Sequence, residues 1–212
     1  MDKHDVKNFK AIGGLIKSGG IVVDVGAHTG TYCNFFLEKL GTTGKVYAVE
    51  IHPENYKVLY KNYQSRNNVI LINKAASDKD GTQDIYGFNI LNTINSYTTN
   101  IIGKDVNDSA LPKLGTVRST RLDTLLAHET KIDLIKIDVE GAEIQVLEGL
   151  SKIYDRVDWL LIECHLDKDW PTIKDILINR YGFSCRDIQY DLPVTIGTVD
   201  RAYQCLCKNE KT

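Results

Sequence analysis

The sequence lacks any apolar run approaching the length of about 20 residues that a membrane-spanning helix needs. It also lacks a cluster of lysine and arginine residues, and its formal net charge is −2 at pH 7. Proteins that bind nucleic acid usually present such a basic patch to the phosphate backbone. We therefore expect no membrane partner, and we do not favour RNA or DNA as a partner.

Cysteine is scarce: the chain has five, an odd number, and no C-x-x-C spacing. The positions are Cys33, Cys164, Cys185, Cys205 and Cys207. This pattern is atypical of a disulfide framework or a structural zinc site. The first 20 residues are polar, are broken by glycines and contain no apolar segment of the kind found in signal peptides. We therefore expect reduced thiols in a cytoplasmic protein.

The residues that are present describe an ordinary folded domain. Hydrophobic residues make up 42% of the 212 residues and charged residues 25%, which are globular values. A chain of this length can bury a full α/β core. We expect one domain over residues 1–212, with residues 1–20 as a helical lead-in.

The chain is organised around the stretch from Ile21 to Gly30. Ile21–Val25 is a short, mostly apolar, β-branched run, typical of a strand buried on both faces. Two glycines, Gly26 and Gly30, follow it, and residues 31–40 have apolar positions at helical spacing. A strand, a glycine turn and a helix start bring free backbone N–H groups together, which predicts a cradle for a nucleotide-like ligand.

The type of nucleotide follows from Asp24. The pattern D-x-G-x-x-x-G places a carboxylate where the dinucleotide fingerprint has its first glycine. That charge would repel a pyrophosphate and would attract a cationic ligand. S-adenosylmethionine carries an ammonium and a sulfonium and has no phosphate. We therefore predict an S-adenosylmethionine site at Asp24, Gly26, His28, Thr29 and Gly30.

The rest of the chain alternates strands with helices. Right-handed crossovers and a parallel sheet follow from this rhythm. Strands are predicted at 45–50, 69–72, 132–138 and 158–164, helices at 54–66, 142–150 and 171–180, and an antiparallel edge pair at 183–188 and 201–207.

Residues 82–119 interrupt the rhythm. A strand is predicted at 83–88, and an asparagine-rich stretch follows it. A loop of this length inside a compact domain is usually a lid or a binding loop. We expect this insertion to lie near the acceptor site.

Further cofactor contacts are predicted at two strand ends. Glu50 ends the second strand about 20 residues after the glycine loop, where a carboxylate can accept both ribose hydroxyls. The alternative is a solvated acid at a strand end. Ser77 and Asp78 follow the third strand and are candidates for the edge of the adenine pocket, with a plain turn as the alternative.

A second group of polar residues gathers around the ends of the fourth and fifth strands. Asp138 and Glu140 are two positions apart, and so are Glu163 and His165. If these strands are neighbours, the side chains meet over the cofactor. Such a cluster suits proton abstraction or a divalent metal. We interpret Asp138, Glu163 and His165 as catalytic and favour the metal-free alternative.

Three of these interpretations have competitors. His165 could be a hydrogen-bonded strand-end histidine, and acids near a helix start are favoured by its dipole alone. Asp138 is also placed to hold the methionine end of the cofactor. Lys136 is a catalytic candidate, but a lysine in an apolar strand needs a partner, so a structural ion pair is the favoured explanation.

The segments VDVGAHTG, AVE and LIKIDVEGAEIQVLEGL, with RLDTLL before the last, resemble the FkbM family of S-adenosylmethionine-dependent methyltransferases over residues 20–166. The family's loop more often has Asn-Ile where this chain has His28-Thr29. The resemblance implies an α/β Rossmann-like class I methyltransferase domain. It also implies a mostly parallel seven-stranded sheet, order 3-2-1-4-5-7-6 with strand seven antiparallel, and helices on both faces.

The same resemblance implies O-methylation of a hydroxyl, often on a sugar or natural product. An N6-adenine or N4-cytosine enzyme would have an Asn/Asp-Pro-Pro-aromatic loop where this chain has DVEG, and a cytosine-C5 enzyme would have Pro-Cys there. RNA or another N-methylation, an NAD-dependent oxidoreductase and a non-catalytic cofactor-binding module stay open as alternatives. So does assembly into a homo-oligomer.

Overall fold

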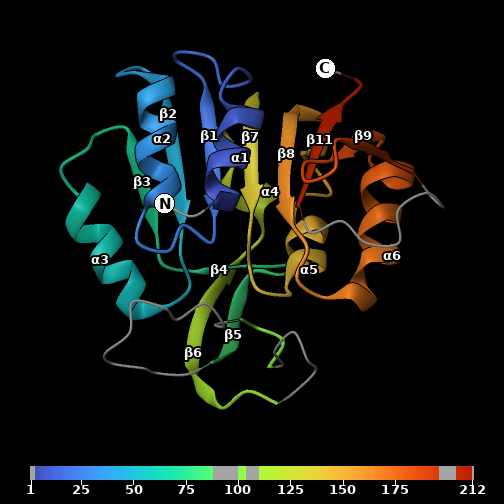
Figure 1. Ribbon diagram of the computed structural model, residues 1–212. Coiled ribbons are helices and arrows are strands. Elements are labelled where there is room, and N and C mark those ends of the chain that lie inside the picture. The colour runs from blue at the N-terminus through green and yellow to red at the C-terminus, as the bar shows by residue number, and fades with distance from the viewer. Residues whose placement is uncertain (1–2, 88–99, 104–109, 196–203, 212) are drawn as a thin grey trace.

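The computed structural model describes residues 3–87, 100–103, 110–195 and 204–211 (Figure 1). In these residues the chain forms one large sheet of eight strands and one small sheet of three. Among the described helices, none has both the length and the apolar character needed to cross a bilayer.

The large sheet has the spatial order β10-β9-β11-β8-β7-β1-β2-β3. Strands β8, β7, β1, β2 and β3 run parallel, whereas β11 is antiparallel to both of its neighbours. The order predicted from the resemblance is confirmed, with β10 as an additional edge strand. The bounds are β1 Ile21–Val25, β2 Lys45–Val49, β3 Val69–Ile72, β7 Ile132–Ile137, β8 Val157–Glu163, β9 Phe183–Asp187, β10 Leu192–Val194 and β11 Gln204–Asn209.

Helices cover both faces of this sheet. Successive strand residues point to opposite faces. Val22 packs in the core with helices α1, α2 and α3, while Val23 packs in the core with α4, α5 and α6. The helices are α1 Lys3–Ile12, α2 Thr31–Leu40, α3 Pro53–Tyr63, α4 Leu122–Leu125, α5 Glu143–Glu148 and α6 Trp170–Lys174. A π-helical segment, Asp175–Arg180, extends α6, and short 3₁₀ turns lie at Tyr154–Arg156 and Asp167–Asp169.

Helix α1 ends where two glycines interrupt the apolar spacing. Apolar residues recur at helical spacing between residues 7 and 17, and the helix ends at Ile12. Gly13 and Gly14 follow at once, and glycine is a poor helix former because it loses the most backbone entropy. The lead-in is therefore a helix followed by turns.

The small sheet occupies part of the predicted insertion. It has the order β4-β6-β5, with bounds β4 Ala75–Ala76, β5 Gly81–Tyr86 and β6 Lys113–Thr120. In Figure 1 it lies beneath the end of the large sheet toward which the arrowheads of the parallel strands point. The loop interpretation is wrong for residues 113–119, because antiparallel pairing with β5 holds this polar segment as a strand. Residues 88–99 and 104–109 of the expected loop lie outside the described residues.

The expectation of five reduced thiols is wrong for two of them. Cys185 on β9 and Cys207 on β11 are directly opposite each other and form a disulfide. The partner of a cysteine in a sheet is set by strand register, which the spacing along the sequence does not reveal. Cys33, Cys164 and Cys205 are free and buried.

Candidate active site

A cavity of about 360 Å³ opens at the carboxyl ends of β1, β2, β7 and β8. In open α/β sheets ligands bind at this edge, where the direction of strand succession reverses between β1 and β7. Its walls carry more acids than bases: Asp5, Glu50, Asp138, Glu140 and Glu163 against His28, Lys74, Lys136 and His165.

The glycine loop after β1 lies against the end of β7. Gly26 has a φ of +80°, and a Cβ there would lie 1.8 Å from the carbonyl oxygen of Asp138. A side chain would have to displace that backbone, so the fold itself requires this glycine. The loop continues through His28, a non-glycine residue with a φ of +50°. Gly26 and His28 both line the cavity, and their contact with a cofactor stays a prediction.

Asp24 and Lys136 form a buried ion pair beneath this loop. Lys136 Nζ lies 3.3 Å from Asp24 Oδ1 and 3.2 Å from Asp138 Oδ2, and it donates to the Gly26 carbonyl at 3.1 Å. Asp24 is fully buried and does not line the cavity. Asp24 therefore pairs with Lys136 inside the protein and does not contact a ligand in the cavity directly. The structural ion pair that the sequence favoured for Lys136 is present.

Glu50 lies at the end of β2 and faces the cavity. Its two carboxylate oxygens accept hydrogen bonds from the backbone N–H groups of His28 and His52, each at 2.7 Å. Burial raises the pKa of Glu50 to about 7, although these two hydrogen bonds and the charge of Lys136 oppose the shift. Each carboxylate oxygen keeps a second lone pair for a ligand hydroxyl.

Besides Asp24, four of the predicted cofactor residues do not line the cavity: Thr29, Gly30, Ser77 and Asp78. Ser77 is fully buried; its hydroxyl donates to Asp78 Oδ1 at 2.9 Å. The Thr29 carbonyl accepts from Asn62, and the Gly30 carbonyl accepts from a tyrosine hydroxyl. The polar groups of Ser77, Thr29 and Gly30 therefore form hydrogen bonds within the protein that stabilise the loops. Ala75 and Ala76, which precede Ser77, form the wall instead.

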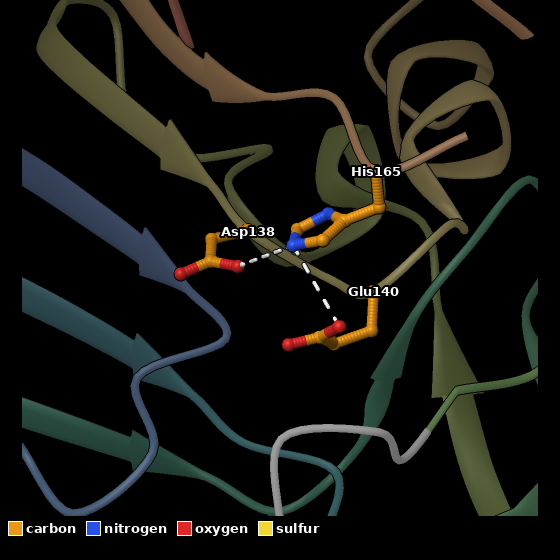
Figure 2. A group of neighbouring side chains, drawn as sticks. All are labelled: Asp138, Glu140 and His165. Carbon is orange, nitrogen blue, oxygen red and sulfur yellow. Dashed lines mark ion pairs between the residues drawn. The ribbon is translucent and has the colours of Figure 1, made fainter. Parts of the chain in front are cut away.

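The second predicted group converges on His165, as Figure 2 shows for Asp138 and Glu140. Nε2 of His165 lies 3.6 Å from Asp138 Oδ1, 3.7 Å from Glu140 Oε2 and 3.8 Å from Glu163 Oε1. The other ring nitrogen, Nδ1, lies 2.7 Å from Glu143 Oε1. Strands β7 and β8 are neighbours, which is why residues so far apart in sequence meet.

Glu140 has an unusual backbone. Its φ is +56°, and the next residue, Gly141, has a φ of +103°. A left-handed conformation is unfavourable for a residue with a Cβ and persists where the surroundings enforce it. Here the side chain of Asn100 donates to the Glu140 carbonyl at 3.0 Å.

The sequence of this chain matches a family model described as the methyltransferase FkbM domain over residues 24–185. The chain belongs to the FkbM methyltransferase family. No curated protein matches the sequence.

Solved structures share the fold of this FkbM methyltransferase domain. Methyltransferase FkbM from Methylobacillus flagellatus KT is similar with a TM-score of 0.57 and 16% identity; the match covers 90% of this chain but only 44% of that one. A precorrin-6y C5,15-methyltransferase from Geobacter metallireducens GS-15 has a TM-score of 0.54 at 11% identity, covering 99% and 90%. A SAM-dependent O-methyltransferase from Thermotoga maritima has a TM-score of 0.50 at 14% identity, covering 99% and 66%. At these identities the likeness establishes the fold.

The electrostatics of the FkbM site centre on His165. Burial lowers the pKa of His165, but the hydrogen bond to Glu143 and the charges of Glu140 and Asp138 outweigh it and raise the pKa to about 10. His165 is therefore an imidazolium at neutral pH. Burial raises the pKa of Asp138, yet Lys136 and then His165 lower it more, so Asp138 is ionised.

The two glutamates at the rim behave in the opposite way. Burial raises the pKa of Glu140 to about 7; His165 opposes the shift, and the neighbouring carboxylates add to it. Burial and the charge of Asp138 raise the pKa of Glu163, while the hydrogen bond from Gln204 lowers it. The surroundings thus lower the pKa of Asp138 and raise the pKa values of Glu140 and Glu163.

A cation could compete for the same space. Asp138, Glu140 and His165 each offer one ligand atom, and these atoms lie within 4.8 Å of one another. A metal ion at Nε2 would have to displace the proton that the surrounding acids stabilise. The metal-free prediction stays a prediction.

Two residues of the site were missed in the sequence. Glu143 is one of the acids near the predicted helix start at residue 142, and it is fully buried and hydrogen-bonded to His165. The available signal was that Glu143 shares a helix face with the buried Val146 and Leu147. Asn100 lies in the asparagine-rich stretch, where no local pattern separates it from its neighbours.

Proposed function

We propose that this chain is an S-adenosylmethionine-dependent methyltransferase that methylates a hydroxyl group of a small molecule. The observation that carries the proposal is the acid-lined cavity at the strand ends of an FkbM domain. A surplus of carboxylates suits a ligand with a sulfonium and an ammonium and disfavours a pyrophosphate. This charge balance argues against the NAD alternative.

The roles of the residues follow from their places around the cavity. Glu50 accepts hydrogen bonds from the ribose hydroxyls, and the loop from Gly26 to His28 closes over the nucleoside. Ala75 and Ala76 supply an apolar wall for the adenine. When bound, the cofactor supplies an electrophilic methyl group. Holding the acceptor oxygen within about 3–3.5 Å of it supplies most of the acceleration.

The acceptor we propose is small and carries no phosphate. The cavity volume of about 360 Å³ lies in the usual range for small-molecule sites. A phosphate backbone would meet the acids of the wall and a chain of net charge −2. This balance disfavours the RNA alternative. Carboxylates with raised pKa values at the rim favour a hydroxyl acceptor, because they can take up its proton.

Calorimetry with S-adenosylhomocysteine tests the cofactor site. We expect micromolar binding that weakens at least tenfold, or about 1.4 kcal/mol, in Glu50→Gln. The matched control is Glu54→Gln, which removes the same charge from an exposed ion pair on α3. Absence of binding to the unaltered protein would refute the cofactor assignment. A panel of sugars and phenols, with S-adenosylhomocysteine formation as the readout, then tests the acceptor class and separates an enzyme from a binding module.

A further inference from the structure

The four carboxylates around His165 differ in the partners that they already have. Asp138 is paired with Lys136 at 3.2 Å. Glu143 Oε1 accepts from the backbone N–H of Gly141 at 3.0 Å and lies 2.7 Å from His165 Nδ1. These two acids are therefore committed to partners inside the protein.

The remaining two acids, Glu140 and Glu163, line the cavity. Glu163 Oε2 accepts a hydrogen bond from Gln204 at 3.0 Å. Within the part of the chain that the structure describes, no hydrogen bond to the Glu140 carboxylate is found, and its ion-pair partner is His165 at 3.7 Å. Glu140 is thus the acid with the most capacity left for a hydroxyl donor.

The backbone of Glu140 is held in place from the small sheet. Asn100 is 2% exposed, and its Oδ1 accepts from the backbone N–H groups of Ile102 and Gly103 at 3.1 and 3.0 Å. The backbone of Asn100 pairs with Tyr86 on β5. With its oxygen fixed in this way, the Asn100 amide nitrogen faces the Glu140 carbonyl, to which it donates. Asn100 therefore ties the small sheet to a left-handed residue in the wall of the site.

We propose that Glu140 accepts the proton of the acceptor hydroxyl, that Glu143 holds His165 as a fixed cation, and that Asn100 is the positioning residue for Glu140. This inference rests on the proposed function. As the acceptor oxygen forms its bond to the methyl carbon, the carbon–sulfur bond breaks with its electron pair leaving on sulfur. The hydroxyl proton passes to the Glu140 carboxylate, so the step balances without a further reactant.

The groups that face Glu140 support this division of roles. Asp138 from the end of β7, Glu143 from α5, and Glu163 and His165 from the end of β8 surround it. Burial and the neighbouring acids place the pKa of Glu140 near 7, close to the value at which a general base works best at neutral pH. His165 holds its proton too firmly to serve as that base.

Nuclear magnetic resonance tests the charge states without any acceptor. In ¹⁵N-histidine spectra we expect both nitrogens of His165 to stay protonated from about pH 6 to about pH 9. In Glu143→Gln we expect His165 to lose a proton within that range. In ¹³C-carboxyl spectra, the glutamate resonance that disappears in Glu140→Gln should titrate near pH 7. Loss of the His165 proton below about pH 8, or an ordinary titration of Glu140, overturns the proposal.

Kinetics with an acceptor from the sugar and phenol panel form the second arm. A general base contributes about 10²–10⁴-fold, so Glu140→Gln should lower kcat at least 100-fold and remove the acidic limb of its pH profile. Asn100→Ala should lower kcat by about tenfold with little change in KM, and the acidic limb should move. Glu54→Gln is the control, with kcat unchanged. A larger loss in Glu163→Gln than in Glu140→Gln overturns the assignment.

Affinity for S-adenosylhomocysteine separates the two proposals. We expect it to stay within twofold in Glu140→Gln and Asn100→Ala. If the unaltered protein binds no S-adenosylhomocysteine, the proposed function fails. If the cofactor product binds but Glu140→Gln transfers methyl groups as fast as the unaltered protein, only the role of Glu140 fails.

Discussion

His165 Nδ1 lies 2.7 Å from Oε1 of Glu143, a carboxylate that has no exposed surface. A strand end and a helix start, 22 residues apart in sequence, are joined by this contact. An acid that is buried with a basic partner stabilises the charged form of that partner. The contact therefore decides that the imidazole enters the site as a cation with its Nε2 directed at three further acids.

The charge of His165 should make the folded protein less stable as the pH rises into the alkaline range. Its pKa is about 10 in the fold against an ordinary 6.5, so between these values the folded chain holds more protons than the unfolded chain. The stabilisation is complete below about pH 6.5 and is lost as the pH rises through about 10. We expect the free energy of unfolding in urea to fall more steeply from about pH 7 to about pH 9.5 in the unaltered protein than in His165→Gln. Equal slopes would mean that His165 is neutral in the fold.

Removal of Lys136 should be strongly destabilising. Lys136→Met leaves the fully buried Asp24 as an uncompensated charge, whereas Asp138 keeps His165 beside it, and breaking a buried pair costs about 3–5 kcal/mol. Urea unfolding measures the loss. Lys57→Met, in an exposed ion pair, is the control and should change stability by less than about 1 kcal/mol. Adding Asp24→Asn to Lys136→Met should recover part of the loss; no recovery would argue against the pair.

Cofactor affinity should rise with pH because of Glu50. The pKa of this carboxyl is about 7, so the ionised form that accepts the ribose hydroxyls best gains population as the pH passes that value. We expect S-adenosylhomocysteine to bind more tightly at about pH 8 than at about pH 6. In Glu50→Gln this dependence should disappear in calorimetry. A persistent dependence in the variant would assign the titration to another group.

Glu140 should be a site where function and stability oppose each other. Glu140→Gly removes a Cβ from a left-handed backbone and an acid from a crowded group, so we expect unfolding to require about 1 kcal/mol more. Methyl transfer should be lost in the same variant. Glu140→Ala keeps the backbone penalty and serves as the comparison. If Ala and Gly are equally stable in urea, the left-handed conformation carries no cost.

The disulfide between β9 and β11 should contribute to stability. It closes a loop with a sequence separation of 22, for which the chain-entropy account gives about 3 kcal/mol. We expect a reductant to lower the urea midpoint of the unaltered protein. The double variant Cys185→Ser/Cys207→Ser should have the lower midpoint without reductant, and its midpoint should not change when the reductant is added. If the reductant does not change the urea midpoint of the unaltered protein, Cys185 and Cys207 are not joined in solution.

Local pattern was sufficient for the parallel half of the sheet. Strands such as β1 and β7 are short apolar runs that can only be buried on both faces, so their residue types predict them directly. The motif around Gly26 and the acids that end β7 and β8 predicted where the cavity lies, because parallel strands end at one edge. The order of the strands came from the family resemblance.

The partners of the side chains were decided by the tertiary structure alone. The spacing of residues could not show that Asp24 is neutralised by Lys136, or that Ser77 turns away from the cavity. Strand β6 is polar and alternates weakly, so only its pairing with β5 makes it a strand. These features depend on contacts between distant segments, and local residue patterns do not specify which segments meet.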